Sequence, residues 1–315
     1  MATLSAYYHA VRAFSFPASV VPALLGVSAS SIIHRDDAQF SFSLIHAILT
    51  LAGCIAIHSV SNLANDYFDY KSGLDSAENF GMKNPLVNGS LSVRELLGEI
   101  ILLFTIALSI GVYFVIVVGL PILWLVMFGT LSAFGYTMPP LKLKYRGLGD
   151  IQVAVSFGML MCFGAYLVQA HSCMTLHSAI AVIILALPQC LHIIAILHAN
   201  NHRDRVSDSR HGVRTLASRL TNSQSIRFQY IMVYGSYGVL IVVWIASLMN
   251  IIDALPVTVL LPLLSLPLAF RVATNITRSE MPGTPAYKLL VAQAARLQLV
   301  SGLFLIIGLL LSLRL

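Results

Sequence analysis

Two groups of polar side chains interrupt a largely apolar sequence, and each combines asparagine with aspartate at helical spacing. The first aspartate cluster is Asn62, Asp66, Asp69 and Asp75, and the second aspartate cluster is Asn200, Asp204 and Asp208. Residues three or four apart lie on one face of a helix, so each cluster points amide and carboxylate oxygens in one direction. Such oxygens are hard ligands that suit Mg²⁺. The spacing therefore predicts a divalent-metal site at the ends of apolar segments.

Arginines alternate with the acids of the second aspartate cluster. They are Arg203, Arg205, Arg210 and Arg214. Guanidinium groups bind phosphate oxygens in pairs, so acids interleaved with arginines favour a metal ion together with a polyanion. For several of these arginines the positive charge expected of cytoplasmic loops is an equally good explanation.

The composition is that of an integral membrane protein. The chain has 315 residues, of which 57% are hydrophobic and only 10% charged, with a mean hydropathy of +0.83. A soluble domain has about a quarter of its residues charged. Nine apolar segments are long enough to cross a bilayer, and they predict an all-α, multi-pass bundle that forms one domain over residues 1–315. The segments are 13–33, 41–62, 95–118, 119–138, 150–170, 175–199, 225–249, 252–275 and 288–313.

The basic residues predict how these helices are oriented. With nine spans, the nineteen Lys and Arg residues all fall on the side of the N-terminus, with the exception of Arg35, Arg296 and Arg314. By the positive-inside rule, this side is cytoplasmic and the C-terminus lies outside, in the inner membrane if the cell is bacterial. Both aspartate clusters fall on the predicted cytoplasmic side.

The opposite side offers little that suggests chemistry. Its loops are short, and their one distinctive feature is the sequence HRDD at 34–37. The four cysteines are scattered without a C-x-x-C pair, and we expect them to be small apolar packing residues. The chain contains no motif for nucleotide hydrolysis, dinucleotide binding, zinc proteolysis or serine hydrolysis.

Three segments carry a resemblance to a known family: NLANDYFDYKSGLD, YTMPPLKLKYRGLGD and AILHANNHRDRVSDSRHGVRTLASRL. With them the chain resembles the UbiA superfamily of intramembrane prenyltransferases, nine-helix proteins with aspartate-rich motifs after helices two and six. The second and third segments look most like the menaquinone-forming branch. That branch includes bacterial 1,4-dihydroxy-2-naphthoate polyprenyltransferases and their animal relatives. The resemblance covers roughly the whole chain.

The resemblance implies a role for particular residues. The residues implied to hold Mg²⁺ are Asp66, Asp69, Asp204 and Asp208. Those implied to bind the diphosphate are Asn62, Lys83, Lys144, Asn200, Asn201 and Arg203. Tyr136 would lie near the reacting carbon. The chain departs from the family at Lys83, where many relatives carry arginine, and lysine supplies charge without a bidentate fork.

The function implied is Mg²⁺-dependent transfer of a polyprenyl group from an allylic polyprenyl diphosphate to an aromatic acceptor. On the menaquinone branch this acceptor is 1,4-dihydroxy-2-naphthoate, and the products are demethylmenaquinone, diphosphate and CO₂. Another acceptor is the first alternative: 4-hydroxybenzoate, a chlorin, haem or a glyceryl phosphate. A cation-coupled transporter is the distant alternative, because its carboxylates would lie at mid-depth and not at helix ends. The expected partners are the two substrates and lipid, with no nucleic acid.

Overall fold

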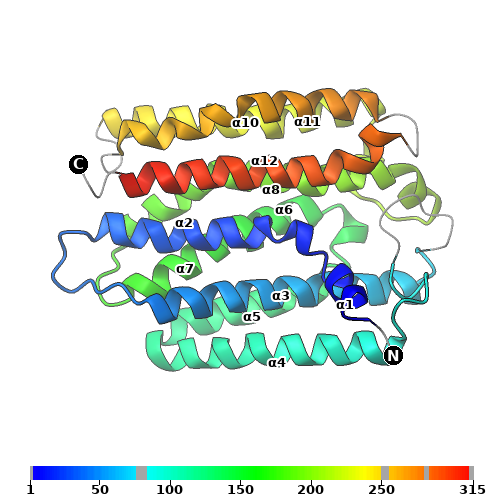
Figure 1. Cartoon of the computed structure of the whole chain (residues 1–315), viewed down its shortest axis with the longest axis horizontal. Coiled ribbons are helices and arrows are strands. Elements are labelled where there is room, and N and C mark those ends of the chain that lie inside the picture. The colour runs from blue at the N-terminus through cyan, green and yellow to red at the C-terminus, as the bar shows by residue number, and fades with distance from the viewer. Residues whose placement is uncertain (1–2, 76–83, 250–254, 280–283, 312–315) are drawn as a thin grey trace.

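The computed structural model describes residues 3–75, 84–249, 255–279 and 284–311, and within these ranges every regular element is helical. The α-helices are α1 (Leu4–Ala10), α2 (Pro17–Ile33), α3 (Leu44–Lys71), α4 (Val93–Val118), α5 (Leu120–Gly135), α6 (Gly149–Val153), α7 (Met161–Ala170), α8 (Leu176–Arg210), α9 (Leu216–Arg219), α10 (Asn222–Leu248), α11 (Leu266–Arg278) and α12 (Pro285–Leu311). The remaining helical turns are η1 (Ala13–Ser15), η2 (Lys144–Arg146), η3 (Ala154–Leu160) and η4 (Val257–Ser265). The predicted all-α class is confirmed (Figure 1).

The long helices run side by side, as expected of a multi-pass membrane protein (Figure 1). Among the described residues, seven helices are long and apolar enough to cross a bilayer, or eight if the bent pair Leu4–Ser15 and Pro17–Ile33 is one span. The predicted count of nine is not reached by this measure, because α5 has only 16 residues. At about 1.5 Å per residue it extends about 24 Å, against about 30 Å for a bilayer core.

The packing shows where lipid and protein interior lie. Along α4, Ile101, Leu102 and Ile116 are exposed, as expected of side chains that face lipid. The interior is formed mainly by α2, α8 and α12, with α7 pressed against α2. This last contact is close because a Cβ atom at Gly26 would lie 2.0 Å from the main-chain oxygen of Cys162. Only glycine allows α2 and α7 to approach this closely.

Both aspartate clusters lie on continuous helices that extend beyond the predicted apolar segments. The first lies at the end of α3 and the second at the end of α8. α3 ends at Lys71, and Gly73 follows with a positive φ of 73°, a backbone conformation that favours glycine after a helix. The C-terminal ends of α3, α8 and α11 lie at the end of the bundle where the N-terminus lies, and the C-terminus lies at the other end (Figure 1).

The chain enters this bundle through a sharp bend. α1 and η1 meet α2 at 58°, and Arg12 at the bend has a left-handed backbone with φ of 56°. This conformation is uncommon for a residue with a side chain. Pro17 then opens α2, where its missing N–H costs no helical hydrogen bond. The bend places the Arg12 side chain against α3, where it enters the candidate site.

Candidate active site

The two carboxylates at the end of α3 are buried, and each contacts a cation from another part of the chain. Asp66 and Asp69 are each 2% exposed. Asp66 forms an ion pair with Arg12. Lys144 Nζ lies 2.7 Å from Asp69 Oδ2, and the Tyr145 hydroxyl donates to Asp69 Oδ1 at 3.2 Å. A buried carboxylate without such partners would be strongly destabilising, so these contacts explain how the cluster is tolerated.

The turn after α3 brings a third carboxylate to the same place. The main-chain oxygen of Asp69 accepts hydrogen bonds from the N–H groups of Leu74 and Asp75, at 3.0 and 3.4 Å. The side-chain amide of Asn84 donates to the main-chain oxygen of Asp66 and to Asp75 Oδ2, both at 2.7 Å. Asp75 therefore folds back over the end of α3, and Asn84 holds it there.

The second aspartate cluster is built differently. Arg203 makes two contacts with Asp204, at 2.8 and 2.7 Å, and its guanidinium also donates to Asn200 Oδ1 at 2.8 Å. The Tyr287 hydroxyl donates to the main-chain oxygen of Arg203 at 2.8 Å, which ties α12 to this turn of α8. The Asp204 side chain is 28% exposed, whereas Asp208 is buried. The two aspartates of this cluster thus occupy unlike environments.

Lys144 joins the two clusters. It lies in the segment between α5 and α6, and its N–H donates to the main-chain oxygen of Tyr136 at 2.9 Å. Burial by itself lowers the pKa of Lys144, but the carboxylates of Asp69 and Asp208 more than offset burial, and the net pKa is raised. The amine is therefore held protonated between the end of α3 and the end of α8.

A polar cavity of about 140 Å³ opens beside these side chains. Its lining includes Arg12, Asn62, Tyr136, Lys144 and Asn200. These five residues come from five separate parts of the fold, and the packing of the helices brings them to one cavity. The cavity can therefore surround a small anionic group with cations and amides.

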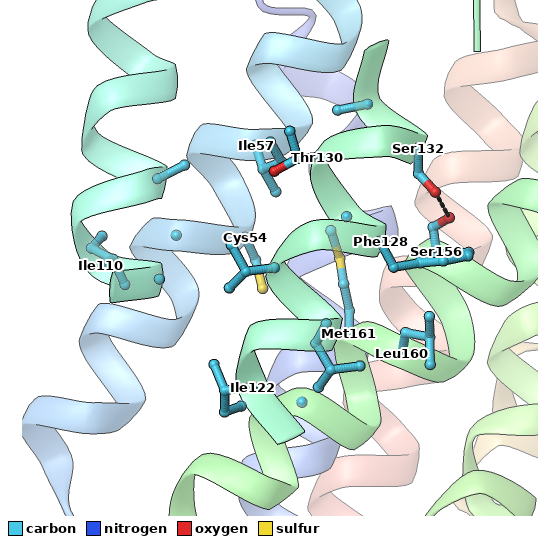
Figure 2. A pocket seen from close by; sticks show the side chains of 18 of the residues that line it. Cys54, Ile57, Ile110, Ile122, Phe128, Thr130, Ser132, Ser156, Leu160 and Met161 are labelled. Atoms are coloured by element: carbon cyan, nitrogen blue, oxygen red, sulfur yellow. Dashed lines mark hydrogen bonds between the residues drawn. The ribbon is translucent and has the colours of Figure 1, made fainter. Parts of the chain in front are cut away.

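An apolar cavity of about 180 Å³ adjoins the polar one, since Ser61 and Phe157 line both. Figure 2 shows this apolar cavity, with Ile57 of α3 and Ile110 of α4 at its wall. Two of its few polar groups pair with each other, since the Ser156 hydroxyl donates to the Ser132 hydroxyl at 3.1 Å. Together the cavities suit a molecule with a charged head and an apolar tail.

Tyr136 lies at the border of the polar cavity because a glycine leaves room for it. A Cβ atom at Gly149 would lie 3.1 Å from Tyr136 Cε2 and 3.4 Å from its hydroxyl oxygen. The tyrosine ring therefore packs directly on the start of α6. This contact fixes the ring near Lys144 and Asn200, which line the same cavity.

The model of the UbiA prenyltransferase family matches residues 16–311. The chain belongs to this family. It is therefore a prenyltransferase, and the predicted superfamily is confirmed. Among curated proteins, it is 31% identical to UbiA prenyltransferase domain-containing protein 1 of Mus musculus, over 98% of this chain and 84% of that protein. The protein of the same name from Homo sapiens is 30% identical, with the same coverage of both chains.

Solved structures agree on the UbiA fold. An apo UbiA homolog from Aeropyrum pernix K1 aligns with a TM-score of 0.61 and 15% identity, covering 97% of this chain and 98% of that one. A UbiA homolog from Archaeoglobus fulgidus bound to GPP and Mg²⁺ aligns with a TM-score of 0.60 and 16% identity, covering 96% of this chain and 99% of that one.

The residues of this UbiA-family site fit a magnesium ion in their chemistry. The carboxylates of Asp66, Asp69 and Asp75 lie near one another at the end of α3, and the end of α8 adds those of Asp204 and Asp208. All are hard oxygen donors of the kind that Mg²⁺ takes. The side-chain oxygen of Asn65, on the cavity wall, is buried without a hydrogen-bond partner. A buried acceptor of this kind is available to a cation or to one of its waters.

The structure brings most of the predicted site residues together. Those that line the polar cavity or contact its lining are Asn62, Asp66, Asp69, Tyr136, Lys144, Asn200 and Arg203. Asp208 is buried near enough to Lys144 to raise the pKa of that amine. Asp204 lies at the edge through its pair with Arg203. Asn201 is buried but is not among the described residues that line the cavity, since it points to another side of α8 than Asn200. The predicted role of Lys83 lies outside the described residues.

Sequence reasoning missed three residues of the site. Arg12 and Tyr145 contact the two buried carboxylates of α3, and Asn84 holds the turn that follows them. Arg12 precedes an apolar segment, where a basic residue is common, so its position in the sequence does not indicate a role in the site. Tyr145 directly follows Lys144, and this adjacency to a predicted site residue was the only indication in the sequence that Tyr145 belongs to the site.

Proposed function

We propose that this prenyltransferase moves a polyprenyl group from an allylic diphosphate to 1,4-dihydroxy-2-naphthoate, with Mg²⁺ as cofactor. The pair of adjoining cavities supports the prenyl-transfer part of the proposal, and the acceptor is proposed from the resemblance of two sequence segments to the menaquinone-forming branch. The polar cavity carries cations and amides for a diphosphate, and the apolar cavity beside it is lined for a prenyl tail. The homolog from Archaeoglobus fulgidus was solved with GPP and Mg²⁺ and also with DMAPP and Mg²⁺, which supports the same pairing here.

In this proposal the basic side chains hold the diphosphate. Lys144 is kept protonated by Asp69 and Asp208, so it offers a permanent positive charge to phosphate oxygens. Arg12 and Arg203 supply forked donors, and Asn62 and Asn200 supply amides on the same wall. Mg²⁺ bound to Asp66, Asp69, Asp204 and Asp208 supplies charge stabilisation to the departing diphosphate. Preorganised charge of this kind usually gives the largest share of the rate.

The proposed reaction breaks the bond between prenyl carbon and diphosphate oxygen, and diphosphate leaves with the electron pair. A new carbon–carbon bond forms between the prenyl group and the electron-rich ring. The ring carboxylate leaves as CO₂, and the electrons of its bond return to the ring. In this proposal Tyr136, which lines the polar cavity, lies near the allylic carbon. The departure of diphosphate leaves an allylic cation on the prenyl group. The apolar walls exclude water, which would otherwise react with this cation.

We further propose that the site faces the cytoplasm and that residues 1–315 form one prenyltransferase domain. The ends of α3, α8 and α11 lie together at one end of the bundle, and the adjoining segments carry most of the basic residues (Figure 1). The positive-inside rule assigns such an end to the cytoplasm. The C-terminus, at the opposite end, then lies outside.

The proposal is tested by offering the purified, lipid-reconstituted protein one allylic diphosphate, Mg²⁺ and several acceptors, with products identified by mass spectrometry. Product from dihydroxynaphthoate alone supports the proposal. Product from 4-hydroxybenzoate alone, or from a chlorin, haem or glyceryl phosphate alone, overturns the acceptor but leaves prenyl transfer intact. Labelled-substrate flux across sealed vesicles without Mg²⁺, in the absence of any prenylated product, would favour transport instead.

A further inference from the structure

The end of the bundle opposite the two aspartate clusters carries another group of metal-ligating side chains. His34 follows α2, Asp37 lies in the α2–α3 loop and Cys173 lies in the α7–α8 loop. One ligand atom from each, a ring nitrogen, a carboxylate oxygen and Sγ, lies within 4.8 Å of the other two. Among the residues that the structure describes, no other trio of histidine, cysteine and acidic side chains comes this close.

The histidine ring is oriented by a chain of hydrogen bonds. Tyr166 donates its hydroxyl proton to Ser178 at 2.7 Å, so its oxygen is left to accept from His34 Nε2 at 2.8 Å. This network assigns the proton to Nε2 and leaves a lone pair on Nδ1. Nδ1 lies 3.6 Å from Asp37 Oδ2. A positive centre placed between these two electron-rich atoms would be bound by both of them.

Hydrogen bonds also fix the two loops against each other. The N–H of Gln39 donates to Asp37 Oδ1 at 2.9 Å, which turns the other carboxylate oxygen toward the histidine. The Ser172 hydroxyl donates to the main-chain oxygen of Gln39 at 3.2 Å, beside the cysteine. Ser43 and Gln169 exchange two hydrogen bonds, at 3.0 and 2.9 Å. The His34 ring and the Asp37 carboxylate are therefore held by supporting contacts, as metal ligands commonly are. The Cys173 thiol donates to the main-chain oxygen of Ala170 at 3.5 Å, a weak hydrogen bond that zinc binding would replace.

We propose that His34, Asp37 and Cys173 bind one zinc ion, which clamps the α2–α3 loop to the α7–α8 loop. Imidazole and thiolate select zinc over magnesium. Zinc–ligand bonds of about 2.0–2.3 Å place tetrahedral ligands roughly 3.5 Å apart, so the side chains need close by only about 1 Å. The fourth position is taken by water, and the cysteine releases its proton to solvent on binding. Asp37 is 36% exposed, which gives the ion a path of entry.

This role for Cys173 differs from the expectation drawn from the sequence, where its isolation from other cysteines predicts a packing residue. The proposed zinc site lies at the other end of the bundle from the polar cavity (Figure 1). We infer that it links the two loops and takes no part in prenyl transfer. A result that disproves the zinc site would therefore leave the proposed function untouched, and the reverse also holds.

The experiment measures zinc in the full-length protein, purified with its tag removed, equilibrated with buffered zinc and analysed by elemental mass spectrometry. We expect about one zinc per chain, falling to near zero in Asp37→Asn and Cys173→Ser. Asp36→Asn is the matched control, because Asp36 is an exposed neighbour outside the trio, and it should keep the zinc. With cobalt in place of zinc, thiolate-to-metal absorption should be present in the wild type and absent in Cys173→Ser.

A second measurement needs no variant, so it stands even if Cys173→Ser does not fold. Zinc should slow maleimide labelling of Cys173 at least tenfold, as read from peptide mass spectrometry, and Mg²⁺ should not. Equal zinc content in wild type and Asp37→Asn would mean an adventitious ion only. That result, or labelling of Cys173 that zinc leaves unchanged, overturns the proposal and leaves His34 and Asp37 as a proton-bridged pair.

Discussion

The two aspartate clusters have similar sequences but different surroundings. At the end of α3, both carboxylates are buried, and each is neutralised by a cation from a distant element, Arg12 before α2 and Lys144 after α5. At the end of α8, Asp204 is neutralised by Arg203, its neighbour in the same helix, and remains partly exposed. Only Asp208 is buried there. Similar spacing therefore gives one half-site that the whole fold preorganises and one that is largely local.

The largest effect is expected at the preorganised half. Asp66→Asn and Asp69→Asn should each lower kcat/KM for prenyl transfer by about 10³-fold or more, because each removes a carboxylate that would hold Mg²⁺ and that fixes a neighbouring cation, Arg12 or Lys144. Steady-state assays in lipid nanodiscs measure this, and Asp36→Asn at the other end of the bundle is the control. If Asp66→Asn and Asp208→Asn both kept near-normal activity, the proposal that both aspartate clusters hold Mg²⁺ would be wrong.

The next effect tests the link between the halves. Lys144→Met should lower kcat/KM by about 10²- to 10³-fold, since it removes a cation that interacts with both Asp69 and Asp208. Lys142→Met is a matched control, because Lys142 lies over the Tyr145 ring at 5.2 Å and does not line the polar cavity. Equal losses in both variants would show that net charge, and not the position of Lys144, matters.

A smaller difference should separate the two aspartates of the second cluster. Asp208→Asn should reduce kcat/KM at least about tenfold more than Asp204→Asn, because a buried charge interacts more strongly than one that is partly exposed. Titrating Mg²⁺ in the same assay shows whether each loss is one of metal affinity. Equal losses would indicate that α8 moves to bury Asp204 when substrate binds.

The smallest expected effect concerns pH. The pKa of Lys144 is raised, so the amine is charged at every pH below its unfolded value of about 10.4. Its ion pair stabilises the fold fully below that value and is lost only as pH rises through the higher folded pKa. Wild type and Lys144→Arg should therefore have pH–rate profiles of the same shape between about pH 7 and 9.5. An alkaline limb that moves in Lys144→Arg would contradict this.

Helical periodicity explains how much of the fold could be predicted. Each predicted apolar segment corresponds to helical structure among the described residues. In lipid the main-chain N–H and C=O groups have no water to bind, and a helix satisfies them within a single segment. The positions of Asn62, Asp66 and Asp69 on one helix follow in the same way. The short α5 and the bend before α2 were not predicted, since helix lengths and breaks depend on how neighbours pack.

The sequence by itself determined what repeats locally: the helices, the faces that carry the two clusters, and the gathering of basic residues toward one end. Only the tertiary structure decided which cation meets which carboxylate, as with Arg12 and Asp66, and which loops bring Cys173 to His34. It also decided where the polar and apolar cavities join. The physical reason is that these contacts join residues far apart in the chain. Their distances are set by helix packing, which no short pattern encodes.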